Sequence, residues 1–213
     1  AVLFGDGAGA VVVEESKKEE DGEIFSFVNG LSSDKLDILE VPNFGSAMDR
    51  FNKDEAARVR WTFDGQEIFK GGIRAMATAS DEVITKSGLK KEDIDILIPH
   101  QANLRIVEGL EKMLKLPNAT TIKKVHKYGN TSAASIPTAL VDALDEGEIK
   151  GGEVAVFTAV GAGLSWGACA LRLGERTTPI NTSDAKLPDF DGKAVDTIRR
   201  AIEYQIPEKK DLI

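Results

Sequence analysis

Two short stretches of this sequence carry polar side chains that could bind a negatively charged oxygen. One is Ile-Pro-His-Gln-Ala-Asn at residues 98–103, and the other is Tyr-Gly-Asn-Thr-Ser at residues 128–132. Each follows an apolar run or a glycine and leads into a helical pattern, so we expect His100 and Asn130 at the mouths of two helices. Unpaired N–H groups and positive dipole ends lie at helix N-termini. A neutral histidine and an asparagine amide placed there would stabilise an oxyanion developing on a thioester or ester carbonyl.

The elements that must position these side chains are indicated by apolar periodicity. Residues 104–114 have apolar side chains at the spacing of one helical face, and another helix is expected from Thr131 or Ser132. A long helix is predicted at 66–87. Strands are predicted at residues 2–4, 10–13, 24–28, 61–63, 94–98, 121–125, 154–160 and 164–173. The alternation of strands and helices in most of the chain predicts an α/β fold.

A glycine-rich turn lies near the start, where Gly5, Gly7 and Gly9 separate two apolar runs. Gly-x-Gly-x-Gly is part of dinucleotide-binding loops, but such a loop leads from a strand into a helix, and a β-branched strand is expected here. We therefore interpret these glycines as positions of close backbone packing within a sheet.

Composition narrows the class of protein. With 213 residues, 42% of them hydrophobic, the chain can form one large domain or one and a half. No apolar run is long enough to span a membrane, and a net charge of -8 disfavours general nucleic-acid binding. The single cysteine is consistent with the cytoplasm. Because the chain opens without Met inside an apolar run, we expect it to be a fragment.

The character of the sequence changes after Leu173. Residues 174–191 are rich in small and polar residues and in proline, and residues 194–204 have a short amphipathic pattern. We therefore predict a domain at residues 1–173, followed by a C-terminal extension at 174–213 that contains a linker and a short helix.

Four motifs occur in a fixed order. They are Leu-Phe-Gly-Asp-Gly-Ala-Gly-Ala at 3–10, Pro-His-Gln-Ala-Asn-Leu-Arg-Ile at 99–106, Tyr-Gly-Asn-Thr-Ser-Ala-Ala-Ser-Ile-Pro at 128–137, and Gly-Ala-Gly-Leu-Ser-Trp-Gly at 161–167. Together they closely resemble the C-terminal half of β-ketoacyl-acyl-carrier-protein synthase III, a thiolase-fold condensing enzyme of fatty-acid synthesis. The resemblance covers residue 1 to about Leu173. It implies the C-terminal half of an α-β-α-β-α layered fold, with a mixed five-stranded sheet and helices.

The resemblance also implies a reaction. A cysteine takes an acyl group from acyl-CoA, malonyl-carrier-protein is decarboxylated, and the resulting carbanion attacks the acyl thioester. By resemblance, His100 and Asn130 donate hydrogen bonds to the enolate, and no metal or cofactor takes part. His100 must then present a protonated nitrogen, either as a neutral tautomer fixed by a neighbour or as an imidazolium.

Further roles follow from the resemblance alone. The backbone N–H of Ala162 matches an oxyanion-hole donor, at a position where relatives often carry Gly. Gln66 and Phe69 match the pantetheine tunnel, where many relatives have Asn at the first position. Three cations match a basic patch for the acidic acyl carrier protein: Lys70, Arg105 and Lys112. The implied partners are acyl-CoA, the carrier protein, a second copy in a homodimer, and an N-terminal half in the same or a separate chain.

Several alternatives stay open at this point. The family's nucleophilic cysteine lies in the N-terminal half, whereas Cys169 lies mid-strand and is interpreted as a small buried hydrophobe, so the enzyme is expected to be incomplete in this chain. His100 could be a structural histidine, Asn130 a helix N-cap, and the three cations solvated charges. The rival functions are an acyl-CoA condensing or acyl-transfer enzyme of secondary metabolism, and a non-catalytic thiolase-fold subunit.

Overall fold

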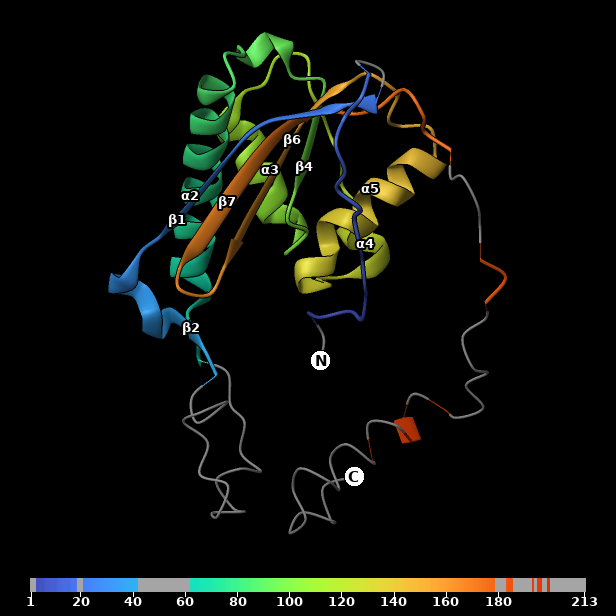
Figure 1. The fold of residues 1–213 in the computed structure, drawn as a ribbon. Coiled ribbons are helices and arrows are strands. Elements are labelled where there is room, and N and C mark those ends of the chain that lie inside the picture. The colour runs from blue at the N-terminus through green and yellow to red at the C-terminus, as the bar shows by residue number, and fades with distance from the viewer. Residues whose placement is uncertain are drawn as a thin grey trace. The chain divides into compact units, whose positions relative to one another are not determined.

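The computed structural model describes residues 3–18, 21–41, 62–178, 183–185, 193, 195–196 and 199. The chain divides into two compact units, Ala1–Leu39 with Phe63–Ile180, and Glu40–Thr62 with Asn181–Ile213. The first unit contains the large sheet and its helices (Figure 1). Trp61 and most of the extension, including nearly all of its expected helix at 194–204, lie outside the described residues, and the boundary at Leu173 stays a prediction.

The first unit is built around a sheet of five strands in the order β1-β7-β6-β4-β5. β4 runs parallel to both β5 and β6, whereas β7 runs antiparallel to both β6 and β1. The mixed five-stranded sheet and the α/β class are therefore confirmed. The bounds are β1 (Glu23–Leu31), β4 (Ile96–Pro99), β5 (Thr120–Thr121), β6 (Val154–Gly161) and β7 (Ser165–Arg172).

Two long helices cover one face of the sheet, α2 (Gly65–Lys86) and α3 (Leu104–Leu114) (Figure 1). Asp64 caps α2, since its Oδ1 accepts hydrogen bonds from the backbone N–H groups of Gln66 and Glu67 at 3.1 and 3.0 Å. The helices approach closely at Gly109, where a Cβ would lie 2.5 Å from Ile73 Cδ1. Their shared core is apolar and fully buried, and includes Met76, Val83, Leu110 and Val156.

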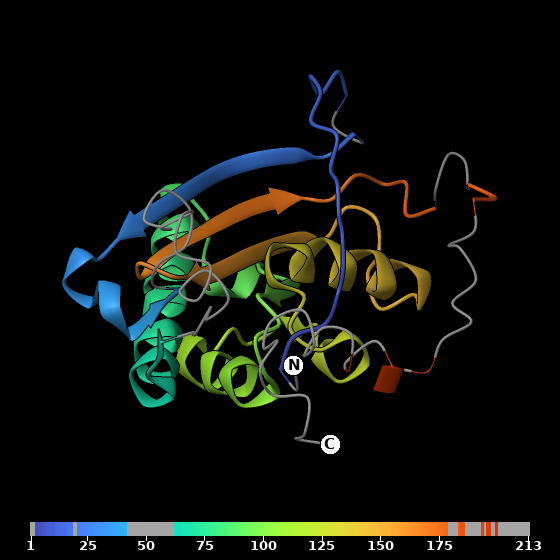
Figure 2. The same ribbon diagram turned by 90° about the horizontal axis from the view of Figure 1, so that it is seen from below.

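The opposite face carries α4 (Val125–Tyr128), the 3₁₀ turn η5 (Ser132–Ala134) and α5 (Ser135–Asp145), as Figure 2 shows from below. Small side chains let α5 pack closely on the sheet: Ala139 and Ala143 meet a core that includes Ile96, Ile98 and Ala155. The remaining elements are η2 (Ser33–Ile38), β2 (Leu39–Glu40), β3 (Thr62–Phe63) and η4 (Lys91–Asp93), and β2 and β3 form a two-stranded sheet.

The strands predicted at the front of the chain are wrong in the part that the structure describes. Phe4 forms an isolated parallel bridge with Asn130 rather than part of a strand, and Val11, Val12 and Val13 are 73%, 92% and 74% exposed. A strand needs a neighbour to pair its backbone groups, and no described strand pairs with these valines. The β-branched run alone could not reveal that.

Two further boundaries differ from the prediction. The strand predicted at 121–125 ends at Thr121, and Val125 instead begins α4, because the side chain of Gln101 accepts the N–H groups of Lys124 and Val125 that a sheet partner would otherwise take. The helix expected from Thr131 or Ser132 begins as a 3₁₀ turn, and α5 starts only at Ser135. Ser132 has a φ of 53°, which an α-helix does not accommodate.

Candidate functional site

The histidine of the first motif lies at the edge of the sheet where the parallel strands β4 and β6 end. Pro99 pairs with Thr158 of β6, and the N–H of His100 donates to the Thr158 carbonyl at 2.8 Å. The sequence predicted His100 at the mouth of a helix, and this prediction is wrong. α3 begins only at Leu104, and its N-cap is Asn103, whose Oδ1 accepts a hydrogen bond from Ile106 N at 3.0 Å. The strand end, rather than a helix dipole, therefore positions the ring.

The ring of His100 is held by a serine from the second motif. His100 Nδ1 lies 2.7 Å from Ser135 Oγ, and the same oxygen accepts a hydrogen bond from the backbone N–H of Gln101 at 3.2 Å. Burial lowers the pKa of His100 from its ordinary value, because a charged imidazolium loses solvation there. Burial therefore favours the neutral form of the ring.

Gln101 fixes the loop that carries His100. Its Nε2 donates to the carbonyls of Pro99 and Ile122, at 2.7 and 3.2 Å. Its Oε1 accepts from Lys124 N at 2.8 Å and from Val125 N at 3.2 Å. The side chain is 2% exposed, so every polar group of this buried amide has a protein partner. Gln101 thereby joins the end of β4 to the start of α4.

Asn130 lies in the turn between α4 and η5, and the front of the chain crosses it. Its backbone N–H donates to the Leu3 carbonyl at 3.1 Å, and its own carbonyl accepts from Gly5 N at 3.0 Å. The crossing is so close that a Cβ on Gly5 would lie 2.0 Å from the Tyr128 carbonyl oxygen. Close packing of these glycines is therefore confirmed, but against a turn and helix rather than within a sheet. Gly9 likewise approaches Pro137.

The side chain of Asn130 is oriented by its own turn. Its Oδ1 accepts a hydrogen bond from Ser132 N at 2.9 Å, which fixes the amide oxygen on the protein side. The two N–H groups of the amide are then the end available to a ligand. The Asn130 amide therefore closes its own turn through its oxygen and can donate hydrogen bonds through its nitrogen at the same time.

A cluster of charges fastens α4 to the end of α5. Lys124, only 4% exposed, is 2.6 Å from Glu146 and 3.0 Å from Glu148, while Lys127 pairs with Asp142. Burial lowers the pKa of Lys124, but hydrogen bonds to Glu146 and Glu148 outweigh it and leave that pKa raised. The Asp142 hydrogen bond raises the pKa of Lys127. The cluster fixes the helix that leads directly into Asn130.

The two motifs meet at Ser135. This residue begins α5, five positions after Asn130, and contacts His100 and Gln101 of the first motif. The structure therefore brings the two predicted motifs together. Gln101 and Ser135 lie within the predicted motifs but had no predicted role, because a separation of 35 positions hides the contact between His100 and Ser135.

Ala162 lies in the turn that joins β6 to β7, at the same edge of the sheet as His100. Its carbonyl accepts a hydrogen bond from Ser165 Oγ at 2.9 Å, which anchors the turn. The first half of α2 packs here, since a Cβ on Gly71 would lie 3.0 Å from Leu164 Cδ1. Gln66 is exposed in the first turn of that helix, and Phe69 is partly buried against the core.

The three predicted patch residues lie on the two helices that pack together, and all are exposed. Lys70 is on α2, and Arg105 and Lys112 are on α3. Arg105, Gly109 and Lys112 follow the spacing of one helical face, and Gly109 meets α2. The two α3 cations therefore follow the side of the helix that adjoins α2. Their role stays a prediction.

A cysteine, Cys169, also lies in the described part of the chain. Cys169 is half-buried in β7, and burial raises the pKa of its thiol, the opposite of what an activated nucleophile needs. The described residues include no group of three or more His, Cys, Asp or Glu side chains that could hold a metal ion. Among the same residues, no helix is long and apolar enough to cross a membrane.

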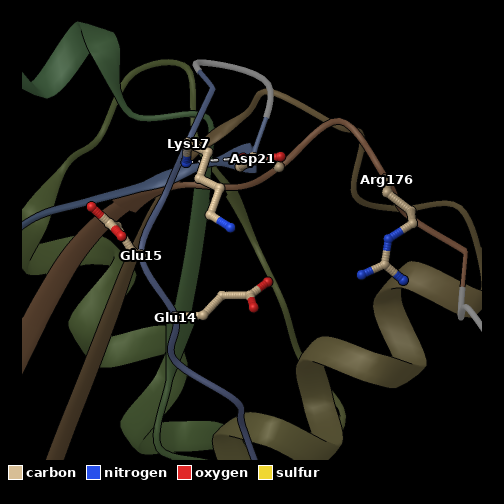
Figure 3. Close-up of a pocket in the computed structure, with 6 residues that line it drawn as sticks. Glu14, Glu15, Lys17, Asp21 and Arg176 are labelled. Atoms are coloured by element: carbon tan, nitrogen blue, oxygen red, sulfur yellow. Dashed lines mark hydrogen bonds between the residues drawn. The ribbon is translucent and has the colours of Figure 1, made fainter.

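A separate hollow of about 320 Å³ lies near the charged turn at the front of the chain (Figure 3). It is lined by Glu14, Glu15, Lys17, Asp21, Gly174 and Arg176. Asp21 Oδ2 accepts the N–H groups of Lys17 and Lys18, each at 3.1 Å, so this carboxylate closes the turn. The hollow contains none of the predicted site residues, and its charged lining does not suit an acyl chain.

Comparison with known proteins gives consistent results. Residues 84–173 match the family model described as 3-oxoacyl-[acyl-carrier-protein] synthase III C terminal. A β-ketoacyl-[acyl-carrier-protein] synthase III 2 of Vibrio cholerae is 46% identical and covers 96% of this chain and 56% of that protein. A synthase III of Listeria monocytogenes is 45% identical, and the alignment covers 82% of this chain and 51% of that protein. The chain spans about half the length of these relatives.

Solved structures that resemble this chain also belong to condensing enzymes. The 3-oxoacyl-(acyl carrier protein) synthase III of Pseudomonas aeruginosa is 35% identical, with a TM-score of 0.72, over 83% of this chain and 52% of that one. A priming β-ketosynthase of the R1128 polyketide pathway is 30% identical, with a TM-score of 0.65, over 71% of this chain and 45% of that one. The Vibrio cholerae alignment leaves only 4% of the chain uncovered, so it continues past Leu173 into the extension.

Proposed function

This chain is related to the C-terminal part of β-ketoacyl-acyl-carrier-protein synthase III, and we propose that its intact protein makes a carbon–carbon bond by decarboxylative Claisen condensation. The substrates are malonyl-carrier-protein and an acyl group derived from acyl-CoA, and the reaction starts a fatty acid. The observation that carries the proposal is the meeting of the two donor motifs at Ser135, which sets His100 and Asn130 on adjoining segments.

The first step is decarboxylation. The bond between the malonyl carboxylate and its α-carbon breaks, carbon dioxide leaves, and the electron pair moves onto the thioester carbonyl oxygen as an enolate. His100 and the Asn130 amide donate hydrogen bonds to this oxygen. Removing one such donor typically costs about 2.7–4 kcal/mol, or about 10²–10³ in kcat. No metal or cofactor is needed, because the donors themselves stabilise the negative charge.

The second step joins the carbon atoms. The enolate carbon attacks the carbonyl of an acyl group held on a cysteine, the tetrahedral oxyanion is bound by backbone N–H groups that include Ala162, and the cysteine thiolate leaves. The half-buried Cys169, with its raised pKa, does not suit that role. We therefore assign the acyl-carrying cysteine to a segment outside these 213 residues, whether in the same chain or in a partner.

Binding of the substrates is assigned to the α2 and α3 side of the unit. Gln66 and Phe69 line the path of the pantetheine arm, and Lys70, Arg105 and Lys112 receive the acidic carrier protein. Charge attraction of this kind raises the association rate more than the final affinity. A homodimer and a cytoplasmic location complete the proposal.

A second candidate function is supported by one of the structural neighbours, the priming ketosynthase of a polyketide pathway. Condensation in secondary metabolism would keep the same donors and change the acyl group. The test is to incubate the intact protein that carries this chain with malonyl-carrier-protein and, in turn, acetyl-CoA, branched-chain acyl-CoA and long-chain acyl-CoA. Mass spectrometry of the carrier protein then identifies the product.

Preference for acetyl-CoA or a branched short-chain acyl-CoA, with a β-ketoacyl product, is the result we expect. Products formed only from other acyl groups would favour the second candidate. The proposal fails if the intact protein neither releases carbon dioxide from malonyl-carrier-protein nor forms a condensed product with any acyl-CoA.

A further inference from the structure

The short contact between His100 and Ser135 requires one hydrogen, which either side chain could supply. The two atoms, Nδ1 and Oγ, are 2.7 Å apart, and Ser135 is only 3% exposed. The same oxygen already accepts a hydrogen bond from Gln101 N at 3.2 Å. The question is which of the two groups, imidazole or hydroxyl, supplies the hydrogen in the short contact.

The donors and acceptors present at this contact identify the group that supplies the hydrogen. If Nδ1 carried the hydrogen, Ser135 Oγ would accept from both His100 and Gln101. The hydroxyl hydrogen would then have no acceptor in this buried place, since His100 Nδ1 is the only acceptor near it within the described residues. A buried polar hydrogen without a partner is energetically unfavourable, because it has given up its hydrogen bond to water. If Nδ1 is the acceptor, every group in the contact is satisfied.

We propose that Ser135 is a positioning residue: its hydroxyl donates to His100 Nδ1 and holds the neutral ring in the tautomer that carries its hydrogen on Nε2. The opposite nitrogen is thus kept as a permanent donor for the substrate oxygen. The low pKa that burial gives His100 supports the neutral ring. Gln101 contributes through its backbone N–H, which orients the hydroxyl oxygen so that its hydrogen is directed to Nδ1.

The inference rests on the proposed function for its consequence, but not for its geometry. Without Ser135, the ring would populate both tautomers, and part of the enzyme would present a bare nitrogen to the developing enolate. The loss should fall on kcat rather than KM, because the donor acts mainly on charge that forms in the transition state. We expect a decrease on the order of tenfold, below the 10²–10³ that loss of a whole donor costs.

The direct test is nitrogen NMR of histidine-labelled protein. The sequence contains only two histidines, so His126→Gln leaves the His100 signals assigned without ambiguity. The wild-type protein should show a single neutral tautomer for His100, protonated on Nε2. In Ser135→Ala, the same ring should show mixed or reversed protonation. A hydrogen on Nδ1 in the wild type, or an unchanged tautomer in Ser135→Ala, would overturn the inference.

Kinetics of malonyl decarboxylation by the intact protein complete the test. Ser135→Ala should lower kcat with KM unchanged, and Ser135→Thr, which keeps a hydroxyl, should recover most of the rate. Ser80→Ala is the matched control, because Ser80 is also a buried helical serine but donates its hydroxyl to Met76 O at 2.8 Å. Its kcat should stay at the wild-type value.

The outcomes separate the inference from the function on which it rests. A single Nε2 tautomer that depends on Ser135, in a protein that decarboxylates nothing, would disprove the proposed function and leave the hydrogen placement supported. An active protein in which Ser135→Ala alters neither the tautomer nor kcat would overturn the inference and leave the function standing.

Discussion

The two donor segments at this site are held in different ways. The His100 loop is fixed by neutral hydrogen bonds of the buried Gln101 side chain, whose four partners all belong to the backbone. The Asn130 turn is fixed instead by a glycine-rich segment that crosses it and by a cluster of charged side chains behind it. Buried neutral bonds are insensitive to salt, whereas partly exposed ion pairs are screened by it. We therefore expect the hydrogen bonds that hold the His100 loop to be insensitive to pH and salt, and the contacts that hold the Asn130 turn to respond to both.

The largest effect should come from breaking the histidine side of the comparison. Gln101→Leu would leave two backbone N–H groups and two carbonyls without their partner in a buried place. Each unsatisfied group costs about 1–3 kcal/mol, so we expect a loss of about 4 kcal/mol or more in the free energy of unfolding. Urea titration measures it. Gln66→Leu, an exposed glutamine on α2, is the control and should stay within about 0.5 kcal/mol.

The second largest loss in the free energy of unfolding is expected from a substitution of Lys124, in the charge cluster that holds the Asn130 turn. Lys124→Met removes the cation that contacts Glu146, Glu148 and Asp142, and leaves Lys127 as the cation paired with Glu146 and Asp142. Both glutamates are partly exposed, so solvent softens the loss, and we expect about 2 kcal/mol rather than the 3–5 of a fully buried pair. The difference from wild type should shrink in high salt. A salt-independent loss would contradict the assigned role of the charges.

Acid should act on the asparagine side as well. Burial raises the pKa of Asp142, but hydrogen bonds from Lys127 and Tyr128 outweigh it and hold that pKa below its ordinary value. The folded state therefore binds fewer protons than the unfolded chain, and the stabilisation is present above the ordinary aspartate pKa and lost as pH falls through the folded one. From neutral pH to about pH 3, stability should fall more in wild type than in Asp142→Asn. Equal slopes in urea titrations would contradict this.

The smallest effect is expected where neither anchor is involved, at the exposed cations. Lys70→Glu, Arg105→Glu and Lys112→Glu should each raise the KM for malonyl-carrier-protein by about twofold to fivefold at low salt, as for single exposed ion pairs. The KM for malonyl-CoA should not change, because no carrier protein is then bound. Lys150→Glu, an exposed lysine beyond α5, is the control. An equal effect of Lys150→Glu would show that Lys70, Arg105 and Lys112 do not form a specific binding patch for the carrier protein.

Much of the fold could be predicted from the sequence, because it depends on local pattern. α3 begins and ends where the apolar spacing at 104–114 placed it, with Asn103 as its cap. The strand runs around 94–98 and 154–160 were recognisable because their residues are mostly apolar, as expected for strands such as β4, whose residues are all buried. The resemblance to the synthase III C-terminal region, which a family model matches at residues 84–173, and the mixed sheet were also predicted correctly.

The errors arose where distant residues decide the local structure. Val125 begins a helix because the Gln101 side chain takes its N–H, and nothing near Val125 in the sequence indicates that. The valines at 11–13 have strand-forming side chains but no described strand to pair with. The contact between His100 and Ser135 joins residues far apart in the chain. Local patterns therefore indicated the candidate residues, whose roles stay predictions, and tertiary contacts decide how those residues are held.

The most direct test of the account is a double-mutant cycle on malonyl decarboxylation by the intact protein. His100→Ala and Asn130→Ala should each lower kcat by about 10²–10³, and the double variant should lose less than the product of the two, because both donors bind one oxygen. His126→Ala, an exposed histidine, should leave kcat unchanged. If His100→Ala and Asn130→Ala both decarboxylate at the wild-type rate, the pair is not the donor site, and the central claim is wrong.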